Sequence, residues 1–126
     1  MILSCDTSAL IKLLISEPGS DQMMESSLRA EAIAVCRITW AETMAGMARR
    51  QRLIDRWDHF TIVEVSQPLV ETAGRFADVF SLRGYDSVQL AASHELHING
   101  DHPVLFASYD RRLNQAAQLL QLEVLP

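Results

Sequence analysis

The sequence has few cysteines, no long hydrophobic run and no recognisable targeting segment. Cys5 and Cys36 are its two cysteines, too few for a disulfide framework, and no Cys-x-x-Cys pair suggests a zinc or redox site. No apolar stretch approaches the ~20 residues of a membrane-spanning helix, and no basic segment precedes the apolar start, as it would in a signal peptide. We therefore expect a cytoplasmic protein with two reduced thiols, each buried at a strand end.

Positive charge is also scarce. The chain has 11 Lys and Arg against 16 Asp and Glu, for a net charge of −5. This balance argues against a general nucleic-acid coat protein, which would be basic. An enzyme acting on nucleic acid remains possible, because a bound divalent cation reverses the local sign of an acidic site.

Short apolar runs alternate with helical segments over residues 1–126, which we predict to form one domain. The alternation favours an α/β fold with a mainly parallel sheet, covered by helices on both faces and carrying its site at the carboxyl ends of the strands. The predicted strands cover residues 1–5, 32–36, 61–65, 104–107 and 122–125. The predicted helices cover residues 9–15, 21–30, 39–50, 53–57, 68–83, 86–97 and 110–120.

Two of these helices have boundaries that depend on single residues. Thr39 is predicted to begin a continuous helix that reaches Arg50. Pro68 fits the first turn of a later helix, and Gly84 stands where the C′ glycine of that helix is expected.

Four acidic residues lie near strand ends in this pattern. Asp6 and Asp110 follow predicted strands, Glu42 lies one turn into the helix after the second strand, and Asp86 begins a helix that only tertiary structure could bring alongside. Carboxylates held together repel one another unless a cation lies among them. Hard oxygen ligands suit Mg²⁺ or Mn²⁺. The four acids therefore predict a divalent metal site able to act on phosphate esters.

Each acid also has a purely structural interpretation. Asp6, Asp86 and Asp110 stand where helix N-caps are expected. Thr39 and Glu42 have the spacing of a capping box. Taken singly, each residue fits capping better than catalysis, so only the joint pattern indicates a catalytic site.

The acids lie in four segments: ILSCDTSAL at 2–10, TWAE at 39–42, RGYDSVQLAA at 83–92, and SYDRRL at 108–113 followed by Ala-Ala at 116–117. In order and separation these segments resemble the PIN-domain family, and within it the VapC toxins of bacterial toxin–antitoxin pairs. The likeness extends along essentially the whole chain. The family often has a glycine shortly before its last strand, where this chain has Leu120-Gln121-Leu122.

The resemblance implies a three-layer α/β/α sandwich with a central sheet of about four or five strands. It implies a Mg²⁺- or Mn²⁺-dependent endoribonuclease that cleaves cellular RNA and stops translation and growth. It also implies a homodimer and a cognate VapB-like antitoxin that blocks the site.

The resemblance further assigns roles to residues. Asp6, Glu42, Asp86 and Asp110 fall on the acidic positions of the family. In this hypothesis Asp6 and Asp86 bind the first metal ion, while Glu42 and Asp110 complete the site or orient the attacking water, leaving a 5′-phosphate and a 3′-hydroxyl.

Two serines and two arginines accompany these acids. Ser8 falls on the position whose hydroxyl supports the first acid, and Ser108 falls where the family often has threonine. Arg111 and Arg112 follow Asp110 directly. They are candidates for RNA phosphate contacts, although solvent-exposed side chains at a helix end explain them equally well.

Several other groups of residues have competing interpretations. His94 and His97 could form a zinc pair, but surface histidines fit better because no third ligand has suitable spacing. The apolar residues Met23, Met24, Met44 and Met47, together with Trp40, Trp57 and Phe60, could form core or a partner surface.

Two alternative functions remain at this level. Asp6-Thr7-Ser8 after a strand could belong to a phosphatase with an aspartate nucleophile, although such enzymes usually have a second aspartate where Ser8 stands. A non-catalytic binding module with the same fold is the other alternative.

Overall fold

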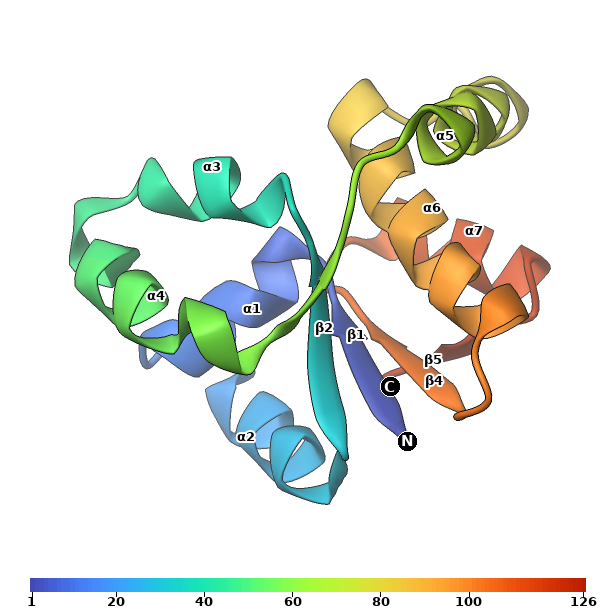
Figure 1. Cartoon of the computed structure of the whole chain (residues 1–126). Coiled ribbons are helices and arrows are strands. Elements are labelled where there is room, and N and C mark those ends of the chain that lie inside the picture. Colours follow the sequence, from blue (N-terminus) through green and yellow to red (C-terminus); the bar gives the residue numbers. More distant parts are fainter.

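Five short strands form one parallel sheet at the centre of the computed structural model, which describes residues 1–126 (Figure 1). Their order across the sheet is β3-β2-β1-β4-β5. The expected parallel α/β architecture is confirmed. The strands are β1 (Ile2–Cys5), β2 (Ala32–Cys36), β3 (Thr61–Val63), β4 (Val104–Ala107) and β5 (Glu123–Val124).

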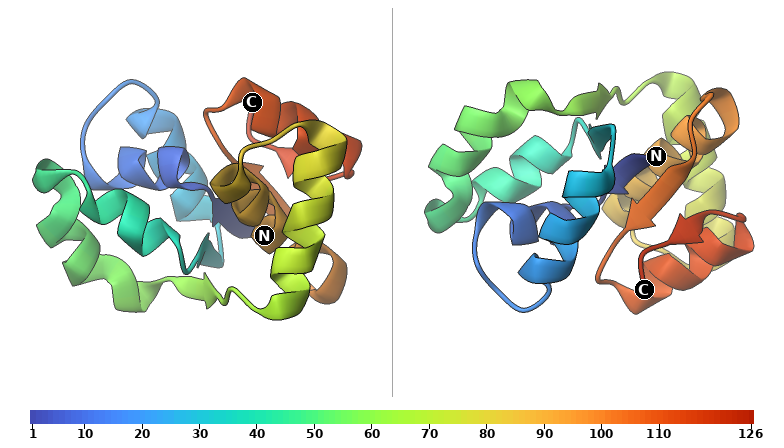
Figure 2. Two further views of the ribbon diagram at one scale, coloured as in Figure 1. Left: turned by 90° about the horizontal axis from the view of Figure 1, so that it is seen from above. Right: turned by 90° about the horizontal axis from the view of Figure 1, so that it is seen from below.

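The helices form the two outer layers of the sandwich. Figures 1 and 2 show α1 to α4 on one side of the sheet and α5 to α7 on the other. Two 3₁₀ turns, at Met47–Arg49 and Trp57–His59, flank α4. The α-helices are α1 (Thr7–Leu14), α2 (Ser20–Arg29), α3 (Thr39–Met44), α4 (Arg50–Arg56), α5 (Gln67–Phe80), α6 (Gly84–Asn99) and α7 (Arg111–Leu119).

Strand β1 has a buried residue on each of its faces. Leu3 and Cys5 belong to a hydrophobic cluster with Leu10 of α1. Ser4, on the opposite face, forms a 2.6 Å hydrogen bond with Ser93 of α6. Because helices cover both faces of the sheet, β2 and β4 are continuous apolar runs rather than alternating ones.

The carboxyl ends of β1 and β4 meet where the chain changes direction across the sheet. From β1 the chain proceeds through β2 to β3, and then returns through α5 and α6 to β4 on the other side of β1. Such a switch point leaves a crevice between adjacent strand ends, where parallel sheets bind their ligands. Cys5 and Ala107 are paired here, so Asp6 and Ser108 follow side by side.

The helix expected over residues 39–50 is interrupted, so that prediction is wrong. Helix α3 ends at Met44, Gly46 has extended backbone angles (φ −101°, ψ 122°), and α4 begins only at Arg50. A glycine within a helix costs about 1 kcal/mol relative to alanine. This weak point is where the chain leaves the helix.

The junction of α5 and α6 also differs from the prediction. Helix α5 ends at Phe80, and Ser81 rather than Gly84 takes the left-handed conformation (φ 54°). The chain leaves the helix early because Leu82 packs against the core. Gly84 instead begins α6, so Asp86 lies within the first turn and the N-cap is Arg83.

The turn before β5 is built without the glycine that the family often has there. Gln121 takes a left-handed conformation (φ 65°), and the N–H of Leu122 donates to the carbonyl oxygen of Ala117 at 3.0 Å. A left-handed conformation costs a non-glycine residue about 1 kcal/mol. The turn is therefore formed at the expense of local backbone strain.

Cys5 and Cys36 are free and buried, as expected. Burial raises the pKa of both thiols, so they are poor nucleophiles and metal ligands. No helix combines the length and the hydrophobicity needed to span a bilayer.

Candidate functional site: an acidic cluster at the switch point

Asp6 is 5% exposed, and both of its carboxylate oxygens accept hydrogen bonds. Oδ1 accepts from the Ser8 hydroxyl at 2.6 Å and from the backbone N–H of Ala9 at 2.9 Å. Oδ2 accepts from the Ser108 hydroxyl at 2.6 Å. Asp6 is thus the N-cap of α1, as its structural interpretation predicts, but two serine hydroxyls hold it more firmly than a cap requires.

Asp110 is joined to Asp6 through Ser108. The Ser108 oxygen that donates to Asp6 also accepts the backbone N–H of Asp110 at 3.0 Å. The N–H of Tyr109 donates to the Ser8 oxygen, also at 3.0 Å. These contacts fasten the turn after β4 to the turn after β1. Asp110 itself caps α7, its Oδ1 accepting from the backbone N–H of Leu113 at 3.1 Å.

Glu42 is held from two other elements. Its Oε1 accepts from the Thr7 hydroxyl and from the Gln89 side-chain amide, each at 2.8 Å. The Gln89 nitrogen lies 2.9 Å from the Thr39 hydroxyl as well. The expected capping box is absent, since Ile38 is the N-cap of α3 and no side chain bonds there. Glu42 is therefore positioned by tertiary contacts.

Asp86 lies half-buried in the first turn of α6, between two of the other acids. It lines a groove together with Glu42, and a small cavity of about 160 Å³ together with Asp110. Helix α6 thus brings Asp86 to the same sheet edge as the acids that follow the strands.

The pKa of Asp6 is raised, chiefly because burial disfavours its charged form. The hydrogen bonds from Ser108 and Ser8 oppose this rise, and the negative charge of Asp110 adds to it. Asp6 forms no ion pair, because the salt bridges of the chain lie elsewhere. A buried carboxylate is thus left without a positive partner.

The pKa of Asp86 is raised as well. Burial is the largest cause, the charges of Asp110 and Glu42 add to it, and Arg83 opposes it. The four acids therefore act electrostatically on one another, although they come from distant parts of the chain.

The four carboxylates fit a divalent cation by their chemistry but do not form a closed binding site. No group of three or more His, Cys, Asp or Glu side chains is arranged so that it could hold a metal ion. All four acids nevertheless offer the hard oxygen donors that Mg²⁺ and Mn²⁺ prefer. A cation would also relieve the unfavourable burial and repulsion at Asp6 and Asp86. The ion itself stays a prediction.

The two predicted phosphate contacts lie on different surfaces. Arg112 lines the small cavity with Asp86 and Asp110, whereas Arg111 lines a separate hollow that includes Tyr109. Arg83, which was not among the predicted phosphate contacts, lines the small cavity as well. The acids therefore have two exposed arginines beside them, one of them unexpected.

Gln89 is the main functional residue that sequence reasoning missed. It stands three residues after Asp86, and Ser93 follows four residues later, so all three lie on one face of α6. Both Gln89 and Ser93 are buried. Polar residues at this spacing on an otherwise apolar buried face were the available signal.

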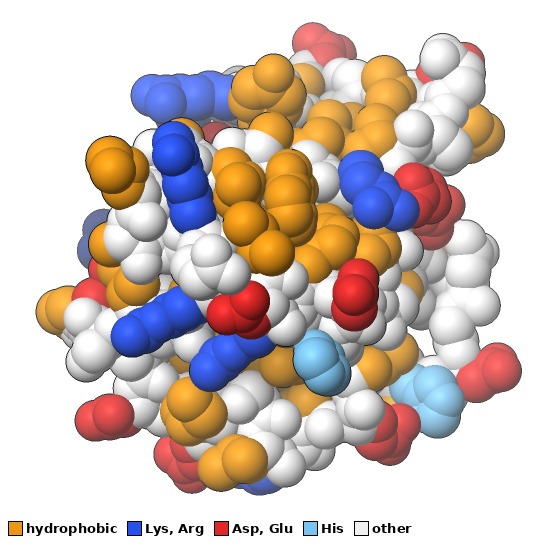
Figure 3. All heavy atoms as spheres, turned by 60° about the vertical axis from the view of Figure 1, so that its left-hand side comes forward, with side chains coloured by type: hydrophobic (Ala, Val, Ile, Leu, Met, Phe, Trp, Pro, Cys, Tyr) orange, Lys and Arg blue, Asp and Glu red, His pale blue; other side chains and the backbone are white.

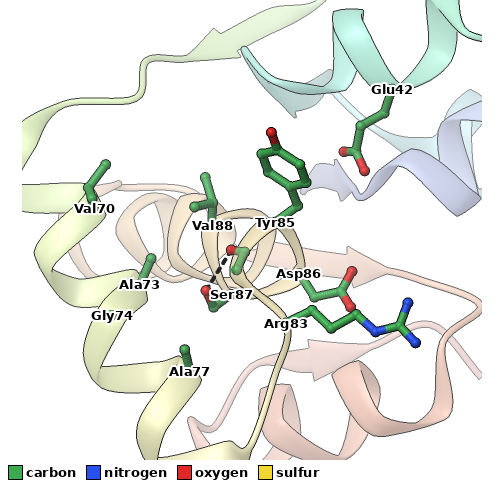
Figure 4. Close-up of a pocket in the computed structure, with 11 residues that line it drawn as sticks. Glu42, Val70, Ala73, Gly74, Ala77, Arg83, Tyr85, Asp86, Ser87 and Val88 are labelled. Carbon is green, nitrogen blue, oxygen red and sulfur yellow. Dashed lines mark hydrogen bonds between the residues drawn. The ribbon is translucent and has the colours of Figure 1, made fainter.

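An apolar groove of about 580 Å³ adjoins Asp86, between α5 and the start of α6 (Figure 4). Val70, Ala73 and Ala77 project from α5 toward α6, and the Tyr85 ring stands near Glu42 (Figure 4). One end of the groove is therefore acidic, and the remainder is hydrophobic.

A second apolar region lies over α3 and α4. Figure 3 views this side, and hydrophobic side chains gather near its centre with charged side chains around them. Trp40, Trp57 and Phe60 pack edge to face in sequence and lie partly buried against the core, whereas Met47 is 82% exposed. The core interpretation holds for Met23, which is fully buried, and for the residues packed against the core, whereas a partner surface stays a prediction.

Of the two histidines expected at the surface, only His97 is exposed, and His94 is half-buried. His94 packs edge-on against Phe76, with ring centroids 5.3 Å apart, and His97 is exposed. Neither belongs to a group of possible metal ligands.

Comparisons with known proteins give one consistent family. The model of the PIN domain family matches residues 4–119. Two Mycobacterium tuberculosis proteins named Ribonuclease VapC45 and Ribonuclease VapC49 are each 29% identical to the chain over 136 aligned residues, covering 96% of the chain and 92% of the relative.

Two solved structures are similar in fold. A toxin–antitoxin complex from Klebsiella pneumoniae matches with a TM-score of 0.69 and 25% identity over 87% of each chain. VapBC2 from Rickettsia felis, bound to a DNA fragment from its promoter, matches with a TM-score of 0.64 and 14% identity over 98% of this chain and 97% of that one. The second likeness concerns the fold alone.

Proposed function

The chain belongs to the PIN domain family, and from this premise we propose that it is the endoribonuclease toxin of a VapBC-type toxin–antitoxin pair. Its similarity to two proteins named as VapC ribonucleases supports the proposal. The observation that carries it is the gathering of Asp6, Glu42, Asp86 and Asp110 at one sheet edge without any ion pair.

In the proposed mechanism, Asp6 and Asp86 would hold a Mg²⁺ or Mn²⁺ ion, and Asp110 would complete its surroundings. When bound, the ion would supply positive charge that makes a water molecule more acidic and offsets the charge developing on the phosphate. Ser8 and Ser108 fix the orientation of Asp6 through its two oxygens. This positioning matters because a carboxylate that swings freely would offer no fixed donor geometry.

Glu42 is the group we assign to accept a proton from the attacking water. Thr7 and Gln89 both donate to its Oε1, and no protein group donates to its Oε2. The donors are neutral, so they orient the carboxylate without cancelling its charge. A fixed carboxylate oxygen facing the groove can take up a proton as the water attacks phosphorus, while the P–O3′ bond breaks and solvent protonates the leaving 3′ oxygen.

Arg83 and Arg112 are the residues we assign to the RNA backbone. Both line the small cavity beside Asp86 and Asp110. Guanidinium groups pair with phosphate oxygens through two parallel hydrogen bonds. Arg111 lines a different hollow and would contact RNA only farther along the strand.

We also propose a cognate antitoxin and a homodimer as partners. The similar Klebsiella pneumoniae structure is a toxin–antitoxin complex. The apolar face over α3 and α4 offers a surface on which a partner could pack (Figure 3).

A phosphatase with Asp6 as nucleophile is disfavoured by the contacts of that residue. Both Asp6 oxygens accept hydrogen bonds, and the side chain is 5% exposed. A nucleophilic oxygen must be free to reach phosphorus. A metal ligand, in contrast, commonly keeps such hydrogen bonds, and the Asp6 Oδ2 accepts only one.

The test is cleavage of single-stranded RNA by the purified chain in Mg²⁺, in Mn²⁺ and in excess EDTA. Asp86→Asn should abolish cleavage without unfolding the protein, and the products should carry 5′-phosphates and 3′-hydroxyls. Asp101→Asn is the matched control, because Asp101 is an exposed acid in the loop before β4, remote from the carboxyl ends of the strands. Cleavage that survives EDTA or Asp86→Asn, or that needs neither metal, would overturn the mechanism. A wild-type protein that cleaves no RNA under any of these conditions would leave the non-catalytic module as the function.

A further inference from the structure

We propose that the groove between α5 and α6 binds a nucleobase of the RNA substrate, next to the scissile phosphate, with Tyr85 as its stacking surface. This inference rests on the proposed ribonuclease function and adds a substrate-binding subsite to it. Three features support the subsite: the open space over Gly74, the exposed ring of Tyr85, and the position of the groove beside the acids.

One residue that lines the groove is a glycine that its helical conformation does not require. Gly74 lies within α5, and a Cβ atom built at this position would meet no atom within 4 Å. Glycine in a helix interior is about 1 kcal/mol less favourable than alanine. Neither helix geometry nor packing within the chain explains why glycine stands at position 74. A flat ligand lying over α5 would explain it.

Tyr85 is a large aromatic side chain left 68% exposed at the edge of the groove. Its ring belongs to none of the aromatic pairs of the chain. Figure 4 shows the ring upright between Glu42 and Val88. Unstacked bases of single-stranded RNA bind to aromatic faces of this kind.

The position of the groove relates this surface to the reaction. Glu42 and Asp86 line the groove and are also members of the acidic cluster. A base is joined to its phosphate by a single sugar, so a phosphate held at Asp86 leaves its neighbouring base beside the groove. Arg83, which borders both the groove and the small cavity, lies where the RNA backbone would pass between them.

A nucleotide uses both ends of the groove, which is why we favour RNA over a protein segment. The volume of about 580 Å³ lies within the range of small-molecule sites. The hydrophobic part matches the faces of a base, and the charged end matches a phosphate with its cation. An apolar protein helix would match only the hydrophobic part and would bury Asp86 unpaired. Glu42, Asp86 and Arg83 are assigned to the attacking water, the metal ion and the RNA backbone. The Ser87 hydroxyl donates to the carbonyl oxygen of Gly84. Few groups therefore remain to read a base, so stacking should dominate and base selectivity should be modest.

The test uses variants of the intact protein and short single-stranded RNAs that carry one abasic nucleotide in turn beside the cleavage site. Tyr85→Ala should lower kcat/KM by roughly tenfold or more, mainly through KM, while Tyr85→Phe should retain wild-type values. Gly74→Leu, which fills the groove, should give a similar loss. Val79→Phe is the control, because Val79 is 71% exposed on α5 and does not line the groove.

Two further measurements make the outcome decisive. An abasic nucleotide next to the cleavage site should slow wild type but cause no added loss in Tyr85→Ala, because the contact is already gone. In an Asp6→Asn background, fluorescence anisotropy should show the same weakening of RNA binding by Tyr85→Ala and Gly74→Leu.

The possible results separate failure of the base-binding subsite from failure of the proposed ribonuclease function. If wild type cleaves RNA and both groove variants match it, the inference is overturned and the ribonuclease function stands. If Gly74→Leu changes the oligomeric state measured by light scattering and RNA binding is unchanged, the groove is an interface between protein chains and the inference is overturned. If wild type cleaves no RNA, the proposed function fails. The anisotropy then still decides whether the groove binds RNA, and equal affinities would reject the subsite.

Discussion

Ser108 and Asp6, 102 positions apart in the chain, form a 2.6 Å hydrogen bond at the carboxyl ends of β4 and β1. The same Ser108 oxygen accepts the backbone N–H of Asp110 at 3.0 Å. One hydroxyl group therefore links the positions of two proposed metal ligands. The link exists because β1 and β4 are neighbours in the sheet.

Replacing this hydroxyl should weaken both stability and activity. Ser108→Ala leaves one oxygen of the buried Asp6 carboxylate without a donor, so the free energy of unfolding should fall by about 1–3 kcal/mol in urea denaturation. RNA cleavage should fall roughly 10- to 100-fold, as when a residue that orients a metal ligand is lost. Ser108→Thr keeps the hydroxyl and should retain most of both. An alanine variant as stable and active as wild type would contradict the role given to Ser108.

Asp6→Asn should make the metal-free protein more stable while abolishing cleavage. Asp6 is a buried, unpaired carboxylate whose pKa is raised by burial, and the amide removes the charge while it can still cap α1 and donate to Ser108. In EDTA, the melting temperature of the variant should exceed that of wild type by at least ~2 °C. Adding Mn²⁺ should raise the melting temperature of wild type only, because ligands stabilise the state that binds them. A variant that melts at a lower temperature than wild type in EDTA would show that the charge of Asp6 does not destabilise the folded protein.

The strained turn before β5 predicts a stabilising substitution. Gln121 has a φ of 65°, a conformation that glycine adopts freely. Gln121→Gly should raise the free energy of unfolding by about 0.5–1 kcal/mol, since the relief of strain exceeds the added flexibility of the unfolded chain. Gln115→Gly, at an exposed position within α7, should lower it by about 1 kcal/mol. Equal effects of the two substitutions would contradict the account of this turn.

His94 should make the protein less stable in mild acid. Burial, with the charge of His97 as a smaller cause, lowers its pKa. The unfolded chain therefore takes up a proton before the folded protein does, and stability falls as pH drops through the ordinary histidine pKa of about 6.5. Between about pH 7.5 and pH 5.5, wild type should lose more unfolding free energy than His94→Gln. Equal losses in urea denaturation would show that His94 does not contribute.

Most of the fold could be predicted because the sequence carries its signals locally. The strands are apolar runs ended by polar residues, and Pro68 lies in the first turn of α5 as expected. The break at Gly46 and the early end of α5 at Ser81 were missed. Gly46 was a local signal, but a single glycine does not by itself end a helix. The end at Ser81 accompanies the packing of Leu82 against the core, which local patterns do not encode.

The candidate site was predictable in part. Asp6 and Asp110 follow paired strands, so strand order alone brings them together. Asp86 and Gln89 reach the same edge only through the packing of α6. Gln89 is not predictable from the sequence as a site residue, because a buried glutamine becomes informative only when its partners, Thr39 and Glu42, are known.

The most direct test of the acidic cluster as a metal site is a titration of Mn²⁺, with the free ion followed by electron paramagnetic resonance. Wild type should remove Mn²⁺ from solution with at least one specific site per chain. The combined Asp6→Asn and Asp86→Asn variant should remove no Mn²⁺ beyond the background of buffer, whereas the control Asp101→Asn should match wild type. Equal uptake by wild type and the double variant, or no uptake by wild type, would contradict the claim that these four carboxylates hold a divalent ion.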